Sequence, residues 1–353
     1  MTHTIPIVGP DMPRAAIFGC AGPVLSADEA AFLRDADPYG FILFKRNVGT
    51  PDQVRSLVAG LRDTVGRDAP VLIDQEGGRV QRLGPPHWRR YPAAQAFVRL
   101  DAVDPGLAEE ALRLSAGLMA ADLTALGIDV DCVPLADVRH PGSHDVIGDR
   151  AFGEDPATVA RLARVQVEAM AAAGVTGVLK HLPGHGRSMV DSHAELPRVE
   201  ADRATLEAVD FPPFAALAGL VPYGMTGHLL FTAIDAERPS TLSPVVIGDV
   251  IRAGIGFDGL LMTDDLSMSA LGGPLSGRAG KALAAGCDLA LHCNGRMAEM
   301  IEVAGAAGPL TGQALARAER ADAVRRRNAA GATPPPGDAV ARLDALLARV
   351  GTA

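Results

Sequence analysis

The chain has 353 residues, of which 48% are hydrophobic and 21% charged, and this is the composition of a folded globular protein rather than of a disordered one. Its formal net charge of −9 argues against a nucleic-acid-binding protein, which needs a basic face. No stretch approaches the roughly 18 uninterrupted apolar residues of a membrane span, and the N-terminus lacks the pattern of a signal peptide. We therefore expect a soluble cytoplasmic protein with no nucleic-acid or membrane partner.

Short apolar runs bounded by Gly, Pro or Asp recur along the chain, and each has the length of a buried strand. There are eight of them, over 15–19, 40–44, 70–78, 128–138, 175–181, 221–228, 259–266 and 287–293. Apolar residues at helical spacing lie between several of these runs, at 51–65, 108–126, 156–173 and 203–218. Strands alternating with helices in this way predict a single (β/α)8 TIM barrel, with an open doubly wound sheet as the alternative.

Signals at the ends of these elements refine the prediction. Thr50 and Asp155 each precede a proline, so each is expected to cap a helix that begins at that proline. Near the C-terminus, the segment AAGATPPPGD is predicted to be a proline-rich connector, and apolar residues at helical spacing follow it. We expect the barrel to occupy 1–330, with 331–353 forming the connector and a C-terminal helix docked on the barrel.

The four cysteines are Cys20, Cys132, Cys287 and Cys293. They show no CxxC spacing, and the last three sit inside apolar segments. We expect reduced, buried thiols rather than a disulfide framework, as is usual in the cytosol.

Polar side chains follow six consecutive predicted strands at the points where those strands end, which is where barrel active sites gather. A helix cap or a surface charge would explain any single one of them, but would explain the set poorly. The residues are Asp74, Gln75, Glu76, Arg79, Arg82, Asp137, Arg139, Arg150, Lys180, His181, His228, Asp264, Asp265, His292 and Asn294. Asp264 is predicted to point into the barrel mouth, whereas its neighbour Asp265 is interpreted as a helix cap.

The segment 180–193, KHLPGHGRSMVDSH, is the loop richest in polar chemistry, because it holds three histidines, a lysine and an aspartate. Asp191 and His193 are two residues apart, so in an extended loop their side chains lie on one face. There the carboxylate can orient the imidazole and raise its basicity.

Two other interpretations of this loop remain open. His181, His185 and His193 could bind a metal, but their spacing matches no zinc pattern, and the two glycines beside His185 would leave it on a flexible segment. Lys180 could form a Schiff base if it is desolvated, or it could be a fixed cation that holds a ligand hydroxyl.

Four motifs together resemble the single-domain bacterial β-N-acetylglucosaminidases of glycoside hydrolase family 3, which act in peptidoglycan recycling. They are DQEGGRVQR (74–82), KHLPGHG (180–186), DSH (191–193) and TDDLSM (263–268). FILFKRN (41–47) and AGCDLALHCN (285–294) extend the resemblance over most of the barrel. The chain departs from the common KHFPGHG pattern at Leu182, which is a change of apolar packing.

The resemblance implies roles for individual residues. Asp264 would be the nucleophile, His193 the general acid/base, and Asp191 the partner that orients His193. The implied contacts to the N-acetylglucosamine ring are Asp74, Arg82, Arg150, Lys180 and His181.

The implied function is a retaining exo-β-N-acetylglucosaminidase that cleaves GlcNAc-1,6-anhydro-MurNAc and its peptides. No metal or cofactor is required by this chemistry, and we expect a monomer or at most a weak homodimer. The alternatives are a phosphorylase of the same family, an aldolase-like barrel that uses Lys180, and a sugar-binding barrel without activity.

Overall fold

The computed structural model describes residues 12–192 and 195–351. Its main sheet has eight parallel strands, and from β1 to β11 each strand pairs with the next one along the chain, while β12 pairs with β1. The strands are β1 (Arg14–Gly19), β2 (Pro38–Leu43), β3 (Val71–Ile73), β6 (Val130–Asp131), β7 (Thr176–Leu182), β9 (Tyr223–Thr226), β11 (Leu260–Met262) and β12 (Ala290–His292). Each lies within or overlaps one of the predicted runs, so all eight predicted strands are confirmed.

The sheet closes on itself between β11 and β12. Met262 forms a parallel bridge with Leu289, and the amide of Thr263 donates to the carbonyl of Leu289 at 3.0 Å. The amide of Leu266 donates to the carbonyl of Leu291, also at 3.0 Å. Because the last strand meets both the first and the seventh, the fold is a (β/α)8 barrel, and the open doubly wound sheet is excluded.

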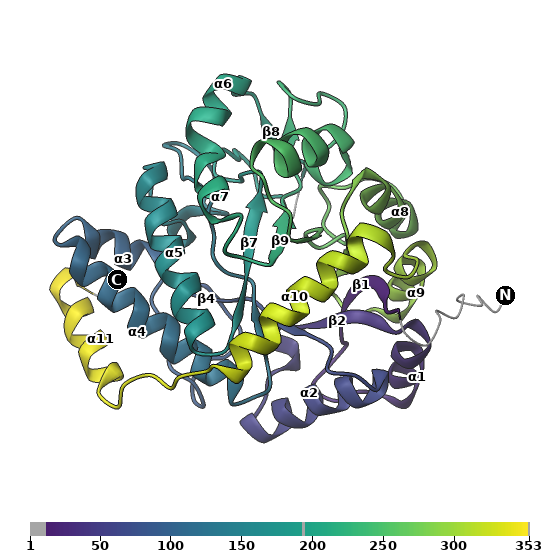
Figure 1. Cartoon of the computed structure of the whole chain (residues 1–353), viewed down its shortest axis with the longest axis horizontal. Helices are drawn as coiled ribbons and strands as arrows, with labels where there is room; N and C mark the ends of the chain where they lie inside the picture. Colours follow the sequence, from purple (N-terminus) through teal and green to yellow (C-terminus); the bar gives the residue numbers. More distant parts are fainter. Residues whose placement is uncertain (1–11, 193–194, 352–353) are drawn as a thin grey trace.

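Helices surround the barrel on its outside (Figure 1). They are α1 (Ala27–Ala36), α2 (Pro51–Val65), α3 (Ala94–Asp101), α4 (Pro105–Thr124), α5 (Pro156–Ala172), α6 (Arg203–Thr205), α7 (Pro212–Leu217), α8 (Leu275–Ala285), α9 (Met297–Ala306), α10 (Gly312–Ala330) and α11 (Ala339–Leu347), with π-helical turns over 206–210 and 246–254. Among the residues that the structure describes, no helix is both long and apolar enough to cross a bilayer.

Local sequence explains where these helices begin and break. The Thr50 and Asp155 side chains accept hydrogen bonds from the amides of Gln53 and Thr158, as capping residues do, so both predicted starts are confirmed. The single helix predicted over 203–218 is instead divided into α6, a π-helical turn and α7. The break falls at Pro212, which has no N–H to donate to the preceding turn.

Side chains alternate across each strand, and this alternation divides the apolar residues into an inner and an outer core. Ile17 of β1 packs inside the barrel, whereas its neighbours Ala16 and Phe18 pack outward against the helices. All four cysteines are buried free thiols, as predicted.

Helix α10 covers the N-terminal end of the barrel and crosses the strands in Figure 1. Tyr39, near the start of β2, donates a hydrogen bond from its hydroxyl to Asp322 of α10 at 3.1 Å, and this hydroxyl lies 3.0 Å from that of Tyr223. Arg325 of α10 is buried and pairs with Asp68 at 2.9 Å. Since this end is covered, a ligand must enter at the C-terminal ends of the strands, where barrel active sites lie.

Helix α11 lies beside α3 and α4 (Figure 1). Ala339, Leu343, Leu346 and Leu347 are buried in the same apolar cluster as residues of α4. The Nη2 of Arg89, in the loop before α3, lies 2.6 Å from the Oδ1 of Asp344. The helix therefore becomes part of the wall beside the C-terminal end of the barrel.

Candidate active site

A cavity of about 580 Å³ opens at the C-terminal ends of the strands. Seven of the eight site residues predicted from the sequence line it, and they come from the ends of four different strands and from the loops that follow. They are Asp74, Arg82, Arg150, Lys180, His181, Asp191 and Asp264. The eighth, His193, lies outside the described residues.

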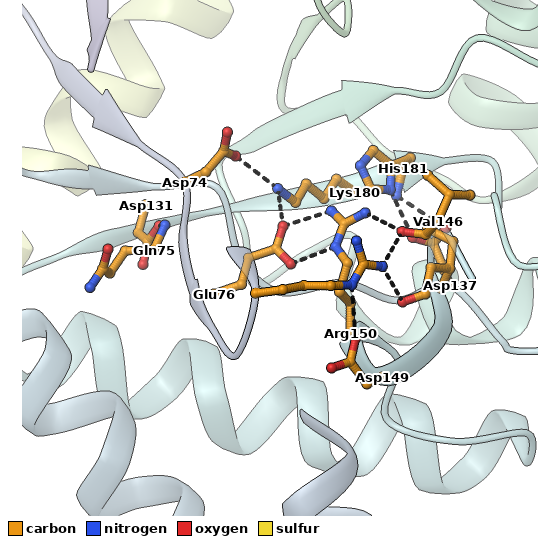
Figure 2. A network of polar contacts seen from close by, with 12 residues as sticks. Asp74, Gln75, Glu76, Asp131, Asp137, Val146, Asp149, Arg150, Lys180 and His181 are labelled. Atoms are coloured by element: carbon orange, nitrogen blue, oxygen red, sulfur yellow. Dashed lines mark hydrogen bonds and ion pairs between the residues drawn. The ribbon is translucent and has the colours of Figure 1, made fainter. Parts of the chain in front are cut away.

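One wall of the cavity is a network of charges around the buried Lys180 (Figure 2). The Nζ of Lys180 lies 3.0 Å from the Oδ1 of Asp74 and 2.7 Å from the Oε1 of Glu76. Arg150 donates from Nε and Nη2 to the two carboxylate oxygens of Glu76, at 2.7 Å each. Arg82 donates to the Oδ2 of Asp74 at 2.8 Å. Three cations thus share two carboxylates, and the cavity gains fixed donors as well as fixed acceptors.

Electrostatic interactions keep Asp74, Glu76 and Lys180 charged. Burial opposes the charge of Glu76, but Arg150 and Lys180 lower its pKa to about 2. Burial likewise opposes ionisation of Asp74, but Lys180 and Arg82 hold its pKa well below the ordinary value. Burial also disfavours the Lys180 ammonium, yet Asp74 and Glu76 raise its pKa above that of a free lysine. A protonated amine cannot attack a carbonyl, so this geometry argues against the Schiff-base alternative.

A second buried carboxylate, Asp137, organises the loop that follows β7. Its Oδ2 accepts from the Nδ1 of His181 at 2.8 Å, and its Oδ1 accepts from the amide of His185 at 2.6 Å. His185 Nε2 in turn lies 3.1 Å from the hydroxyl of Ser192. The prediction that His185 sits on a flexible segment is wrong, because its side chain is buried and joins the start of the loop to Ser192, one residue after Asp191.

The protonation state of His185 follows from this arrangement. Burial and the neighbouring His181 lower the pKa of His185 to about 4, so its ring is neutral near pH 7. Among the residues with a described position, no group of three His, Cys, Asp or Glu side chains is arranged to bind a metal. His185 therefore holds the loop in place.

Asp264 lies two residues after the end of β11 and is half-buried at the cavity. Burial opposes its charge, but His228, His181 and the amide of Asp265 hold its pKa below the ordinary value, and that amide donates to Oδ1 at 2.8 Å. The carboxylate is therefore ionised near neutral pH, which the predicted role of nucleophile requires.

The neighbouring Asp265 plays a different part from the one predicted. No described helix begins at this position, since α8 starts ten residues later at Leu275, so the helix-cap interpretation is wrong. Its carboxylate instead accepts from the amides of Ser267, at 3.0 Å, and Cys293, at 3.1 Å. Asp265 thereby fixes the turn that presents Asp264.

Gly186 lets the loop lie against the barrel. A Cβ at this position would come 1.7 Å from the carbonyl oxygen of Val138, which no side chain allows. We expect Gly186→Ala to push the His185–Ser192 segment out of place and to lower kcat/KM by about 10²-fold, since ångström-scale misplacement of catalytic groups has effects of that order.

The control for this prediction is Gly219→Ala, because a Cβ there meets no atom within 4 Å. Both variants should be tested for glycosidase activity and by circular dichroism. A folded Gly186→Ala protein with wild-type kcat/KM would show that the loop's close approach to Val138 is not needed for activity.

Two residues that organise the site, Glu76 and Asp137, were among the polar residues at strand ends but were given no role in the predicted site. Glu76 lies two positions after Asp74, so both side chains can point to the same side. A buried lysine needs counter-charges, and these two signals together could have predicted that Glu76 pairs with Lys180. Asp137 follows the fourth predicted strand, but its partners His181 and His185 are distant in sequence. Apolar side chains of Met225 and Leu291 complete the cavity.

An eight-stranded barrel whose carboxylates and imidazoles meet in one cavity at the C-terminal strand ends has the construction of a barrel enzyme. The family model described as glycosyl hydrolase family 3 N terminal domain matches residues 16–326. The chain therefore belongs to glycosyl hydrolase family 3 and is a glycoside hydrolase, in agreement with the resemblance seen in its motifs.

Individual relatives agree with this assignment. The chain is 41% identical to a beta-hexosaminidase of Alkalilimnicola ehrlichii, over 79% of this chain and 80% of that protein. It is also 41% identical to a beta-hexosaminidase of Methylococcus capsulatus, over 79% and 82% of the two chains. The structure of NagZ from Neisseria gonorrhoeae in complex with zinc ion superposes with a TM-score of 0.81 at 27% identity, over 98% of this chain and 99% of that one.

Proposed function

We propose that this protein is a retaining exo-β-N-acetylglucosaminidase that acts in the cytoplasm on peptidoglycan fragments, releasing terminal non-reducing N-acetylglucosamine from GlcNAc-1,6-anhydro-MurNAc and its peptides. The observation that carries the proposal is that Asp264 and the loop residue Asp191, from distant parts of the chain, line one cavity. The names of the relatives support hexosamine as the sugar.

In the first step, the Asp264 carboxylate attacks the anomeric carbon and the bond to the leaving oxygen breaks. His193 gives its proton to that oxygen, and a glycosyl-enzyme ester forms. In the second step, His193 takes a proton from water, the water oxygen attacks the anomeric carbon, and the ester bond to Asp264 breaks. Two displacements at one carbon give net retention.

A histidine is chemically suited to replace the second carboxylic acid of the usual glycosidase pair. Its unperturbed pKa of about 6.5 allows it to donate and then to accept a proton near neutral pH. Asp191 precedes His193 by two residues and would orient the ring. A neutral imidazole also avoids placing a further anion close to Asp264.

The charged wall supplies the contacts that hold the sugar. Asp74 can accept hydrogen bonds from ring hydroxyls, while Lys180 and Arg82 can donate to hydroxyl oxygens. His181 uses Nδ1 to bond Asp137, so its Nε2 is the ring nitrogen left for the substrate. Arg150 lines the cavity while paired to Glu76, and so adds positive charge beside the sugar.

The proposal is tested by incubating the full chain with GlcNAc-1,6-anhydro-MurNAc and with other β-linked N-acetylhexosaminides. We expect release of N-acetylglucosamine that is first formed as the β-anomer, at a rate unchanged by EDTA. Proton NMR during the first minutes identifies the anomer. Release of the α-anomer, or no release from any of these substrates, would overturn the proposal.

Repeating the reaction with inorganic phosphate separates hydrolysis from phosphorolysis. The hydrolase should form free sugar at a rate independent of phosphate, whereas a phosphorylase would form a sugar phosphate. Borohydride together with a carbonyl substrate should trap no adduct on Lys180, because its amine stays protonated.

A further inference from the structure

A second and larger cavity, of about 1320 Å³, lies beside the first. The two share Arg79 and Arg82, on the hairpin of β4 (Gln75–Gly77) and β5 (Val80–Gln81). Its other walls are the loop over 84–93, the beginning of α3, and the C-terminal segment that contains α11. We call this second cavity the basic groove.

The charge of the groove is opposite in sign to that of the chain. Six cationic side chains line it against two carboxylates, in a protein whose net charge is −9. The cations are Lys45, Arg79, Arg82, Arg89, Arg90 and Arg99, and the carboxylates are Asp149 and Asp344.

Three of these cations are already paired and three are not. Arg79 pairs with Asp149 at 3.1 Å, and Arg89 pairs with Asp344 at 2.6 Å. Arg82 turns toward the first cavity, where it pairs with Asp74. Within residues 12–192 and 195–351, the side chains of Lys45, Arg90 and Arg99 have no hydrogen-bond or ion-pair partner. Unpaired cations gathered along one groove favour an anionic ligand.

We propose that the basic groove binds the part of the substrate beyond the scissile bond, and that it selects aglycones that are extended and carry carboxylates. This inference rests on the proposed function, since it takes the first cavity as the site of the terminal sugar. The groove adjoins that cavity at Arg79 and Arg82, so an aglycone that leaves the sugar pocket past these two side chains would reach it. A peptide with free carboxylates supplies charges that Arg90, Arg99 and Lys45 can pair.

The C-terminal helix gives the groove one of its walls. Asp344 and Leu347 of α11, and Ala348 just after it, line the groove. These residues lie beyond 16–326, the part of the chain that the family model matches. We therefore assign the C-terminal segment a role in aglycone selection.

The test compares three substrates: a neutral aryl β-N-acetylglucosaminide, a disaccharide-peptide with free carboxylates, and the same disaccharide-peptide with those carboxylates amidated. The double variant Arg90→Gln/Arg99→Gln should lose about fivefold or more of kcat/KM on the carboxylate substrate and stay within about twofold on the other two. Raising the salt concentration should weaken the wild-type preference for the carboxylate substrate, because added ions screen exposed charges.

Matched variants separate the groove from general effects of charge. Arg34→Gln/Lys281→Gln removes two exposed cations on α1 and α8, which line neither cavity, and should change nothing. Ala348→Glu places a negative charge in the groove and should lower kcat/KM on the carboxylate substrate alone. Ala345→Glu adds the same charge to an exposed position of α11 that does not line the groove, and should have no such effect.

The outcomes distinguish this inference from the proposed function. Failure of the wild type to cleave even the aryl glycoside would overturn the proposed function and, with it, the role of the groove. Cleavage of the aryl glycoside with equal kcat/KM on free and amidated peptides, or with no selective loss in Arg90→Gln/Arg99→Gln, would overturn the groove's role alone.

Discussion

Replacing Asp264 with Ala is expected to lower kcat on an aryl β-N-acetylglucosaminide by more than about 10³-fold, while the protein stays folded. The loss is large because removing a nucleophile removes the whole covalent pathway, not one stabilising contact. The fold should survive because Asp264 lies in a loop and accepts a hydrogen bond from the adjacent amide of Asp265. Stopped assays of p-nitrophenol release, with circular dichroism on the same sample, measure both quantities.

Adding azide to Asp264→Ala tests specifically whether Asp264 acts as a nucleophile. In Asp264→Ala the small anion can occupy the space of the carboxylate and attack the anomeric carbon in a single displacement, forming a glycosyl azide of inverted, α configuration. The matched control is Asp258→Asn, an exposed carboxylate that pairs with Arg317 and Arg320 outside the cavity and should keep wild-type kcat. Near-normal activity in folded Asp264→Ala would falsify the assignment.

The barrel could be predicted from the sequence because its strands are buried on both faces. Each strand then appears as a short continuous apolar run, and Thr50-Pro51 and Asp155-Pro156 mark helix starts through local chemistry alone. The closure between β11 and β12 depends on contacts between segments distant from each other, such as Met262 with Leu289, and only the count of eight strands pointed to it. Pro212 was a local signal for a break in the predicted helix over 203–218, but the helical spacing of the apolar residues across it favoured one continuous helix.

The sequence predicted which residues form the site, but not which of them pair with one another. The strand-end pattern, the loop after the fifth predicted strand and the family resemblance together identified seven residues that the structure places around one cavity, because the barrel fixes where strand ends meet. The pairing pattern could not be predicted, since it depends on side chains that converge from different strands. Glu76 was seen as one more polar residue, whereas the structure places it between Lys180 and Arg150 (Figure 2).

Replacing Glu76 with Gln is expected to destabilise the protein by about 3–5 kcal/mol and to lower kcat/KM by about 10²-fold. The amide has nearly the shape of the carboxylate but no charge, so Lys180 would keep only Asp74 as an ion-pair partner and Arg150 would lose its ion pair. Lys180 would then be drawn toward Asp74 and away from its place beside the sugar. Urea denaturation at pH 7 measures the stability, and steady-state kinetics measures the loss of activity.

The dependence of protein stability on pH tests whether the charge of Glu76 matters, because a merely structural role for this residue would not change that dependence. Its folded-state pKa of about 2 lies below the ordinary 4.5, so the wild type gains stability above pH 4.5 and loses it as the pH falls toward 2. The shift corresponds to about 3 kcal/mol, and Glu76→Gln should lack that share of the slope in this window. Glu302→Gln, an exposed change on α9, should keep the wild-type slope. If Glu76→Gln keeps it as well, the charge of Glu76 does not hold the network together, and Asp74 alone must stabilise Lys180.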